Sequence, residues 1–507
     1  MKSVVVKFLG LAGAAVLLAA CDRAAEVDEV FEVAVSAPFT SLDPVRTVDA
    51  NTLQLHLNTY SLLFRQRRNG EVEPSLAVSA DSPDRKRWEI VLRRGVHFCG
   101  VAGDREVNAD DVVATLTRAA LSPNSRVSWV FREVEKAGGK PRIEKLAADR
   151  LAVYFREPVD LPRYLTLPQL GVLPAEVIDR KLSPTESSMG SGPYRISRYG
   201  PDGVELTACA GGFPKAKIDK VRIRIVRDRQ VAMGMIKSGQ VDAMELDFSQ
   251  WRQVTTEKGA PKDTRLVYNA NPADFRYILF NTRDPRLRDP AARRALNHAL
   301  DRSKLCRGPL LNFCRPVNFV SAMEGVEGGN DLYQPEKAKQ EWQALASPPR
   351  EITLLTFSNE VDRTVAQWVA REWKKTLGLE VKVKVMDFGP LLGTLFGGKE
   401  FTAATLWVQP LSDLPEIWFL AWQPGDMPPR GRNISRLDDP RFTALFNELR
   451  QRGRVQGWLS QKVEAVLEQD PPAAPLYQLT WAWLVNKDYE LPVGRIKTLE
   501  LWEVTPR

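Results

Sequence analysis

Histidine and cysteine side chains most often bind metals or act as bases and nucleophiles, and this 507-residue chain has only three histidines, His56, His97 and His298. His97 and Cys99 lie near enough in sequence to share a metal ion. A structural histidine beside a structural cysteine is the simpler interpretation, because no Cys-x-x-Cys pair or larger Cys/His cluster accompanies them. We therefore predict no metal site and no cofactor.

Motifs that carry catalysis are also missing from the sequence. It contains no Gly-x-Ser-x-Gly, no phosphate-binding Walker loop and no His-Glu-x-x-His. The glycine-rich segment 190–194 lacks the spacing and the following helix of a phosphate loop, so we predict a turn there. We accordingly predict that the chain is not an enzyme and has no catalytic residues.

Four cysteines outside the first segment could form disulfides if the chain is exported, because extracytoplasmic compartments are oxidising. Cys306 and Cys314 enclose only seven residues and are the favoured pair. Cys99 and Cys209 would then pair by elimination. Three pairings of four cysteines are possible, and the sequence does not choose among them.

The first residues predict export. Lys2 and Lys7 lie close to an apolar run, Phe8–Ala20, that ends in Leu-Ala-Ala-Cys at Cys21. The run of 13 residues is too short to span a bilayer, which needs about 20. Its end resembles the lipobox of bacterial lipoproteins, which implies a lipid on Cys21, and Asp22 resembles their inner-membrane retention signal. The alternative is an ordinary secretory signal in which Cys21 has no role.

The length and the charge of the chain after residue 21 indicate how it is organised and what it binds. Removing residues 1–21 leaves 486 residues, too many for one simple core, so two or three lobes are expected. Without Lys2 and Lys7, 69 basic residues face 63 acidic ones, a balance of +6. Because the two signs are mixed along the chain, we predict no nucleic-acid partner.

Hydrophobic patterns predict an α/β protein. Residues 351–357, 364–377 and 381–385 form a strand, a helix ended by Gly378 and an alternating strand, which is a βαβ unit with a parallel sheet. Asn108 is a suitable cap for a helix that carries Asp110 and Asp111 in its first turn. A further helix is predicted over 52–64.

Several segments in order resemble one family, the solute-binding proteins of peptide/nickel-type ABC importers (family 5). The resemblance covers nearly all of the chain after the signal. The segments that resemble family motifs are Ser41-Leu42-Asp43-Pro44, Leu63-Phe64, Pro74–Ala77, Arg94–Phe98, Asn108–Val112, Gly190-Ser191-Gly192-Pro193-Tyr194, Ser238–Asp242, Phe280-Asn281-Thr282, Arg293 to Arg302, and Ala474-Pro475-Leu476-Tyr477.

The resemblance implies the fold of periplasmic binding proteins: a two-lobed clamp with an extra subdomain, of type II and similar to cluster C. On this basis residues 1–21 are the signal and 22–29 a tether. Residues 30–270 form lobe I, with the subdomain inserted at approximately 60–170. Residues 271–480 form lobe II, and 481–507 return to lobe I.

The resemblance also implies ligand-site residues. Peptide receptors of the family often carry Trp-x-x-Asp, whose Asp pairs with the peptide amine. Here Trp407 is followed by Val408, Gln409 and Pro410, and proline offers neither charge nor N–H. Asp413 could substitute if the loop differs, but the favoured interpretation is that it matches the family's second, structural Asp. We carry over Phe39, Trp407, Val408, Gln409 and Asp413 as ligand-binding candidates.

The function implied is capture of a peptide or peptide-like solute between the lobes and its delivery to an ABC permease and ATPase. The protein is expected to be a periplasmic monomer, held by lipid on Cys21 at the inner membrane of a Gram-negative bacterium. Two alternatives remain. The same fold could bind a sugar, an opine-like conjugate or a metal chelate, or it could act as a periplasmic scaffold or sensor without transport.

Overall fold

The computed structural model describes residues 30–47, 49–67, 71–100, 105–178, 189–257, 259–269, 274–319, 331–409, 414–419, 421–425, 427–429, 431–452, 457–494 and 498–507. Cys21, Asp22, the tether, Pro410 and Asp413 lie outside these ranges. Within them, no helix combines the length and the apolarity needed to cross a membrane.

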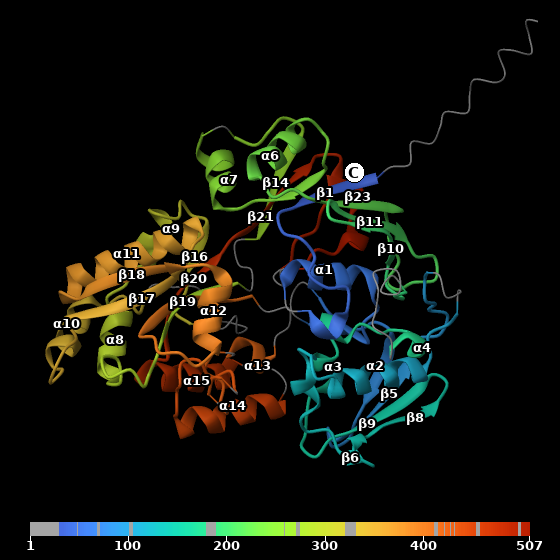
Figure 1. Ribbon diagram of the computed structural model, residues 1–507, viewed down its shortest axis with the longest axis horizontal. Coiled ribbons are helices and arrows are strands. Elements are labelled where there is room, and N and C mark those ends of the chain that lie inside the picture. Colours follow the sequence, from blue (N-terminus) through green and yellow to red (C-terminus); the bar gives the residue numbers. More distant parts are fainter. Residues whose placement is uncertain are drawn as a thin grey trace, which may run out of the picture.

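Two large sheets organise the molecule (Figure 1). The first has the order β10-β11-β12-β1-β13-β21-β14 and the second the order β16-β20-β15-β19-β17-β18. The strands of the first sheet are, in that order, Tyr194–Gly200, Gly203–Ala208, Lys220–Ile225, Val30–Val35, Ala243–Glu245, Trp481–Asn486 and Thr264–Asn269. Those of the second are Cys314–Pro316, Ala473–Leu479, Phe275–Phe280, Ala403–Val408, Glu351–Phe357 and Glu380–Met386.

A smaller antiparallel sheet, β4-β5-β9-β8, forms a separate layer under helix α2 and defines the subdomain. Its strands are Ala77–Asp81, Arg87–Leu92, Arg150–Tyr154 and Ile143–Ala147. Short strand pairs are β2 (Phe64–Gln66) with β3 (Val72–Pro74), β6 (Lys136–Ala137) with β7 (Lys140–Pro141), and β22 (Tyr489–Glu490) with β23 (Thr505–Pro506).

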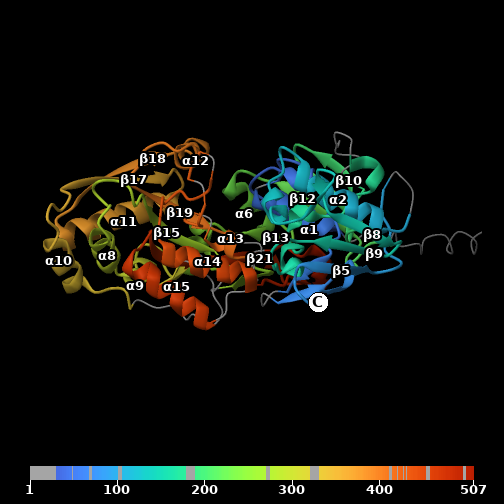
Figure 2. The same ribbon diagram turned by 90° about the horizontal axis from the view of Figure 1, so that it is seen from below.

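Helices cover the sheets (Figures 1 and 2). Those of the first sheet and the subdomain are α1 (Ala50–Thr59), α2 (Ala109–Leu121), α3 (Leu161–Tyr164), α4 (Ala175–Ile178), α6 (Arg229–Lys237) and α7 (Phe248–Arg252). Those around the second sheet are α8 (Pro290–His298), α9 (Arg302–Arg307), α10 (Pro335–Gln343), α11 (Glu360–Leu377), α12 (Phe388–Phe396), α13 (Pro415–Trp418), α14 (Pro440–Arg452) and α15 (Gly457–Gln469).

The predicted βαβ unit is confirmed. β17 and β18 are parallel, with Glu351 opposite Glu380, and α11 connects them. Asn359 caps α11 by accepting a hydrogen bond from the Asp362 N–H, and Gly378 ends the helix at φ +72°. Glycine is suited to this left-handed position because it has no Cβ to collide with the backbone. The predicted cap of α2 is also confirmed, since Asn108 and Asp111 form a capping box.

The helix predicted over 52–64 is wrong at its end, because α1 stops at Thr59 and Phe64 begins β2. The glycine-rich segment explains this stop. The Thr59 carbonyl accepts a hydrogen bond from the Gly192 N–H at 3.2 Å. A Cβ on Gly190 would lie 1.8 Å from the same oxygen, so glycine is required for this approach. The segment is therefore a close-packed turn, as predicted, and its packing overrides the local helical pattern.

The chain passes between the two large sheets at two places. β14 ends at Asn269 and β15 begins at Phe275, while β20 ends at Leu479 and β21 begins at Trp481. Such paired short crossings allow two bodies to rotate about them. We propose these crossings as the boundaries of lobe I (the first sheet, with the inserted subdomain) and lobe II (the second sheet).

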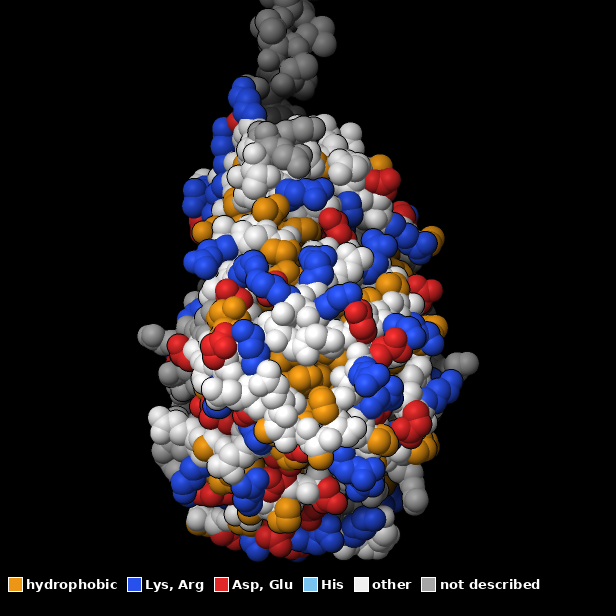
Figure 3. All heavy atoms as spheres, turned by 90° about the vertical axis from the view of Figure 1, so that its left-hand side faces the viewer, with side chains coloured by type: hydrophobic (Ala, Val, Ile, Leu, Met, Phe, Trp, Pro, Cys, Tyr) orange, Lys and Arg blue, Asp and Glu red, His pale blue; other side chains and the backbone are white. Residues whose placement is uncertain are grey.

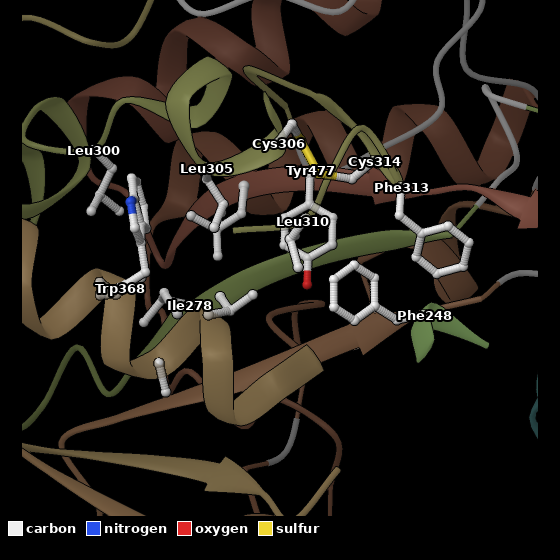
Figure 4. Packing of buried hydrophobic residues seen from close by; sticks show 14 of the residues in the cluster. Phe248, Ile278, Leu300, Leu305, Cys306, Leu310, Phe313, Cys314, Trp368 and Tyr477 are labelled. Carbon is white, nitrogen blue, oxygen red and sulfur yellow. A yellow bond between two sulfur atoms is a disulfide. The ribbon is translucent and has the colours of Figure 1, made fainter. Parts of the chain in front are cut away.

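The apolar core continues from one lobe into the other near these crossings. Phe248 of α7 lies 5.9 Å from Phe313, measured between ring centres (Figure 4). Phe313 lies next to the Cys306–Cys314 disulfide, which joins α9 to β16 with a Cα–Cα distance of 5.4 Å. The second disulfide, Cys99–Cys209, has a Cα–Cα distance of 5.9 Å and ties the subdomain to the first sheet.

Candidate ligand-binding cavity

A cavity of about 730 Å³ lies between the subdomain and lobe II. Its walls come from a turn of the subdomain after α2, from the segment 416–432 that includes α13, and from α14. The lining residues are Ser128, Trp129, Arg132, Glu416, Gln423, Pro424, Gly425, Gly431, Arg432, Phe446, Asn447 and Arg450. Because the first wall belongs to the subdomain and the other two belong to lobe II, separating these bodies would open the cavity.

Local contacts hold the two walls in place. In the subdomain, the Arg126 N–H donates to the Val45 carbonyl at 2.7 Å, and a short 3-10 helix, Ser128–Phe131, presents Trp129. In lobe II, the buried Asn433 side chain donates from Nδ2 to the Leu437 carbonyl at 2.7 Å. This turn fixes the backbone of the neighbouring Arg432.

Arg432 has an unusual electrostatic environment. Burial lowers the pKa of its guanidinium, and the positive charges of Arg132 and Arg126 lower it further. Within the described residues no carboxylate lies within ion-pair distance of any of these three arginines. Arg432 instead lies over the Trp129 ring, 5.9 Å from its centre. Three like charges without a counter-charge favour an anionic group in the cavity.

Glu416 and Arg450 form a second charged group on the cavity wall. Glu416 Oε1 accepts hydrogen bonds from the Tyr164 hydroxyl at 2.7 Å and from Arg450 Nε at 3.0 Å. Burial and the nearby Glu416 charge raise the pKa of Tyr164, so the phenol stays protonated and remains a donor. Tyr164 belongs to α3 of the subdomain, whereas Glu416 and Arg450 belong to lobe II. The contact therefore bridges the two bodies.

Apolar contacts join the same two bodies. Leu414 is fully buried in the apolar core of the subdomain, although it lies just before α13 of lobe II. Ile417 packs against both the subdomain core and the core under the second sheet. The structure thus shows the subdomain and lobe II in contact around the cavity.

Two residues predicted to bind ligand are in apolar cores. Phe39 is 8 % exposed and belongs to the core of the first sheet. Val408 is 7 % exposed and lies opposite Phe275 on the face of the second sheet that packs on α13 and α14. Both side chains therefore pack in apolar cores in this structure.

Trp407 lies on the opposite face of its strand in a polar and aromatic group. The Arg276 guanidinium lies 4.7 Å from the centre of its ring, and the Phe357 ring centre is 4.3 Å away. Arg276 Nε donates to Asp274 Oδ1 at 2.9 Å. Burial opposes the charge on Arg276, but Asp274 and Asp362 outweigh it and raise the Arg276 pKa.

Gln409, another residue predicted to bind ligand, is half-buried and directly follows β19. The last of the five, Asp413, lies outside the described residues. None of the four described candidates is among the residues that line the cavity beside Arg132 and Arg432, called the arginine cavity below. The residues that do, above all Arg132 and Arg432, were missed because isolated arginines in a chain of mixed charge carry no signal of their own.

In the described part of the chain, no group of three or more His, Cys, Asp or Glu side chains could hold a metal ion.

Figure 3 shows basic and acidic side chains interspersed on the outer face of lobe II, without a large area of one sign. This outer face thus carries no concentration of positive charge like that at the cavity.

Comparison with known proteins identifies similar chains. Residues 71–431 match the family model of bacterial extracellular solute-binding proteins, family 5 Middle. The glutathione-binding protein GsiB of Salmonella choleraesuis (strain SC-B67) is 25% identical over 400 residues, which cover 76% of this chain and 74% of that protein.

Solved structures share the fold. The periplasmic binding protein DppA from Helicobacter pylori, in complex with the peptide STSA, superimposes with a TM-score of 0.76 at 18% identity, covering 94% of this chain and 98% of that one. NikZ from Campylobacter jejuni, in complex with Ni(L-His), gives a TM-score of 0.76 at 19% identity, covering 94% and 99%. The predicted two-lobed clamp is confirmed by these superpositions.

Proposed function

The chain belongs to the bacterial extracellular solute-binding proteins of family 5, and from this premise we propose that it captures an acidic, peptide-like solute at the arginine cavity. Membership of the family makes it the extracytoplasmic substrate-binding component of an ABC importer, which works with a permease and an ATPase. The finer statement concerns the solute, and it rests on the chemistry of the cavity.

One observation carries the proposal: Arg432 is half-buried beside Arg132 and Arg126, and no carboxylate of the described residues neutralises the group. A buried cation without a counter-charge is costly, whereas a solute carboxylate would form charge-assisted hydrogen bonds with a guanidinium. Glutathione, a free peptide and histidine, which occur in the names of the compared proteins, all carry a carboxylate. This shared group fits the arginine cavity.

Closure of the clamp supports the same function. The cavity walls come from two bodies, so a solute that contacts both stabilises their closed arrangement. Closure also removes water from the contacts and strengthens the attraction between the arginines and an anion. Trp129 offers a flat apolar surface next to the charges. We keep Trp407 and Gln409, at the end of β19, as proposed solute contacts beyond the lining of the cavity, and Asp413 as a further proposed contact.

The test uses residues 22–507 with the lipidated cysteine removed, refolded to release bound solute. Thermal unfolding would be followed with trialanine, C-terminally amidated trialanine, glutathione, a sugar panel and Ni(L-His). We expect stabilisation by acids with free carboxylates, about 2.7 kcal/mol at a hundredfold excess over Kd, and none by the amidated peptide. Equal binding of the amidated and free peptides would contradict an anion site.

A variant tests the cavity itself. Arg432→Gln should weaken binding of the active acid at least tenfold, because the partly buried cation that pairs with its carboxylate is removed. Arg371→Gln is the matched control, since Arg371 is an exposed arginine on α11 outside the cavity. Stabilisation by sugars alone would favour the non-peptide alternative, and no stabilisation by any compound would favour a scaffold or sensor.

We also propose that the protein is a monomeric lipoprotein without catalytic activity. The apolar run ending at Cys21 supports export and acylation, and Asp22 supports retention at the inner membrane. Mass spectrometry of the membrane fraction would detect lipid on an N-terminal cysteine. A soluble chain beginning at another residue would contradict the anchor.

A further inference from the structure

The Glu416 carboxylate has two oxygens in different situations. Oε1 accepts hydrogen bonds from the Tyr164 hydroxyl and from Arg450 Nε, at 2.7 and 3.0 Å. Oε2 is buried and has no hydrogen-bond donor. The residue as a whole is 7 % exposed and lines the arginine cavity. A buried charged acceptor is therefore left incomplete beside the cavity.

Such an arrangement costs free energy unless a donor completes it, because buried carboxylate oxygens lose their hydrogen bonds to water. Native proteins satisfy nearly all such atoms, so an exception indicates a missing partner. The protein donors at Oε1 restrict the carboxylate, and Arg450 balances its charge. A partner for Glu416 therefore needs a hydrogen-bond donor but not a positive charge.

We propose that Glu416 accepts a hydrogen bond from an N–H of the bound solute and is a specificity-determining residue of the cavity. The inference rests on the proposed function, since it assumes that the solute binds in this cavity. With the arginines it defines a solute class: an acid that also carries an amine or amide N–H. Amino-acid conjugates and peptides meet both requirements, whereas simple polycarboxylates meet only the first.

Tyr164 and Arg450 are positioning residues in this arrangement. Tyr164 reaches Glu416 from the subdomain, so its hydrogen bond forms only when the subdomain and lobe II are together. A solute N–H bound to the same carboxylate would therefore lie at the contact between the subdomain and lobe II. A site with a buried polar group discriminates strongly against analogues that lack the complementary group.

The experiment is isothermal titration of the full mature protein with trialanine and glutathione, which carry N–H donors, and with tricarballylate and succinate, which carry neither N–H nor hydroxyl donors when ionised. The wild type should bind the N–H acids more tightly. Glu416→Gln should weaken them at least tenfold and leave the polycarboxylates unchanged or tighter, because Arg450 loses its counter-charge. Glu448→Gln, on α14 outside the cavity, is the matched control.

A second variant keeps the test decisive if Glu416→Gln does not fold. Tyr164→Phe retains the Glu416 charge and removes a donor to Oε1, and it should reduce the preference for N–H acids at least threefold. Equal losses for both solute classes, or no loss in either variant, would overturn the inference. If Arg432→Gln also leaves every affinity unchanged, the proposed function fails. If only Arg432→Gln has an effect, the role of Glu416 alone fails.

Discussion

At Arg432, three effects act on a single side chain: burial, the positive charge of Arg132 and that of Arg126 all disfavour the charged guanidinium. Arginine nevertheless remains protonated, so the unfavourable energy persists until an anion arrives. Glu416 presents the opposite case, a paired carboxylate with one unsatisfied oxygen. Individual residues of the cavity thus indicate a solute with complementary charge and hydrogen-bonding groups.

His56 of α1 shows burial of a titratable group away from the cavity. Its ring lies 5.4 Å from the Tyr60 ring, and the side chain is only 1 % exposed. Burial lowers the pKa of His56 to about 4, although Asp49 and Asp43 favour its charged form. The ring is therefore neutral in the folded protein at physiological pH.

We expect this histidine to make the protein less stable in acid. His56 binds a proton near pH 6.5 in the unfolded chain but only near pH 4 in the folded protein. The stabilisation of the folded state that depends on a neutral His56 is therefore complete above pH 6.5 and is lost as the pH falls to 4. The loss is roughly 3 kcal/mol over this window. His56→Leu should flatten the dependence of the unfolding midpoint on pH between 6.5 and 4. Parallel curves for the variant and the wild type would contradict the prediction.

At the scale of elements, the turn at 190–194 packs closely against the end of helix α1. The turn donates the Gly192 N–H to the last carbonyl of the helix, and it can approach so closely only because glycine lacks a Cβ. The same contact explains why the helix ends earlier than its hydrophobic pattern predicts. The packing of one element therefore sets the length of another.

Gly192→Ala tests this contact. The added Cβ would lie 2.5 Å from the Thr59 carbonyl carbon and 2.7 Å from the Tyr60 nitrogen, and both are backbone atoms that cannot move aside. We expect destabilisation by about 2–3 kcal/mol, as for other overpacked sites. The matched control is Gly234→Ala in α6, where nothing lies within 4 Å of the added Cβ. That change should stabilise by up to about 1 kcal/mol.

Thermal unfolding of both variants measures the difference. A lower melting temperature for Gly192→Ala and an equal or higher one for Gly234→Ala are expected. Equal melting temperatures for the two variants would show that α1 and the turn can separate without cost.

On the scale of the whole molecule, one disulfide joins the subdomain to the first sheet, and two chain crossings join lobe I to lobe II. Cys99–Cys209 joins the subdomain to the first sheet across 110 residues, whereas Cys306–Cys314 closes a separation of 8 within lobe II. The subdomain also contacts lobe II through Leu414 and Tyr164. The long-range disulfide therefore fixes one side of the clamp, and the cavity contacts connect it to the other.

Removing each disulfide should have unequal effects. Loop-closure entropy predicts a loss of about 5 kcal/mol for the Cys99→Ala/Cys209→Ala variant and about 2.5 kcal/mol for Cys306→Ala/Cys314→Ala. The midpoints of thermal unfolding of the two double variants, compared with the wild type, measure this order. The reverse order would show that packing around Cys306 and Cys314 outweighs chain entropy.

The sequence by itself determined the α/β class, the βαβ unit at 351–386, the cap at Asn108 and the resemblance to family 5, because these depend on local periodicity and on ordered motifs. It also favoured the correct short disulfide pair, Cys306 with Cys314. Only the tertiary structure decided where α1 ends and which residues line the cavity. Arg132 is far in the chain from Glu416 and Arg432, and its charge acts on Arg432 only after folding has brought two bodies together and has excluded water between them.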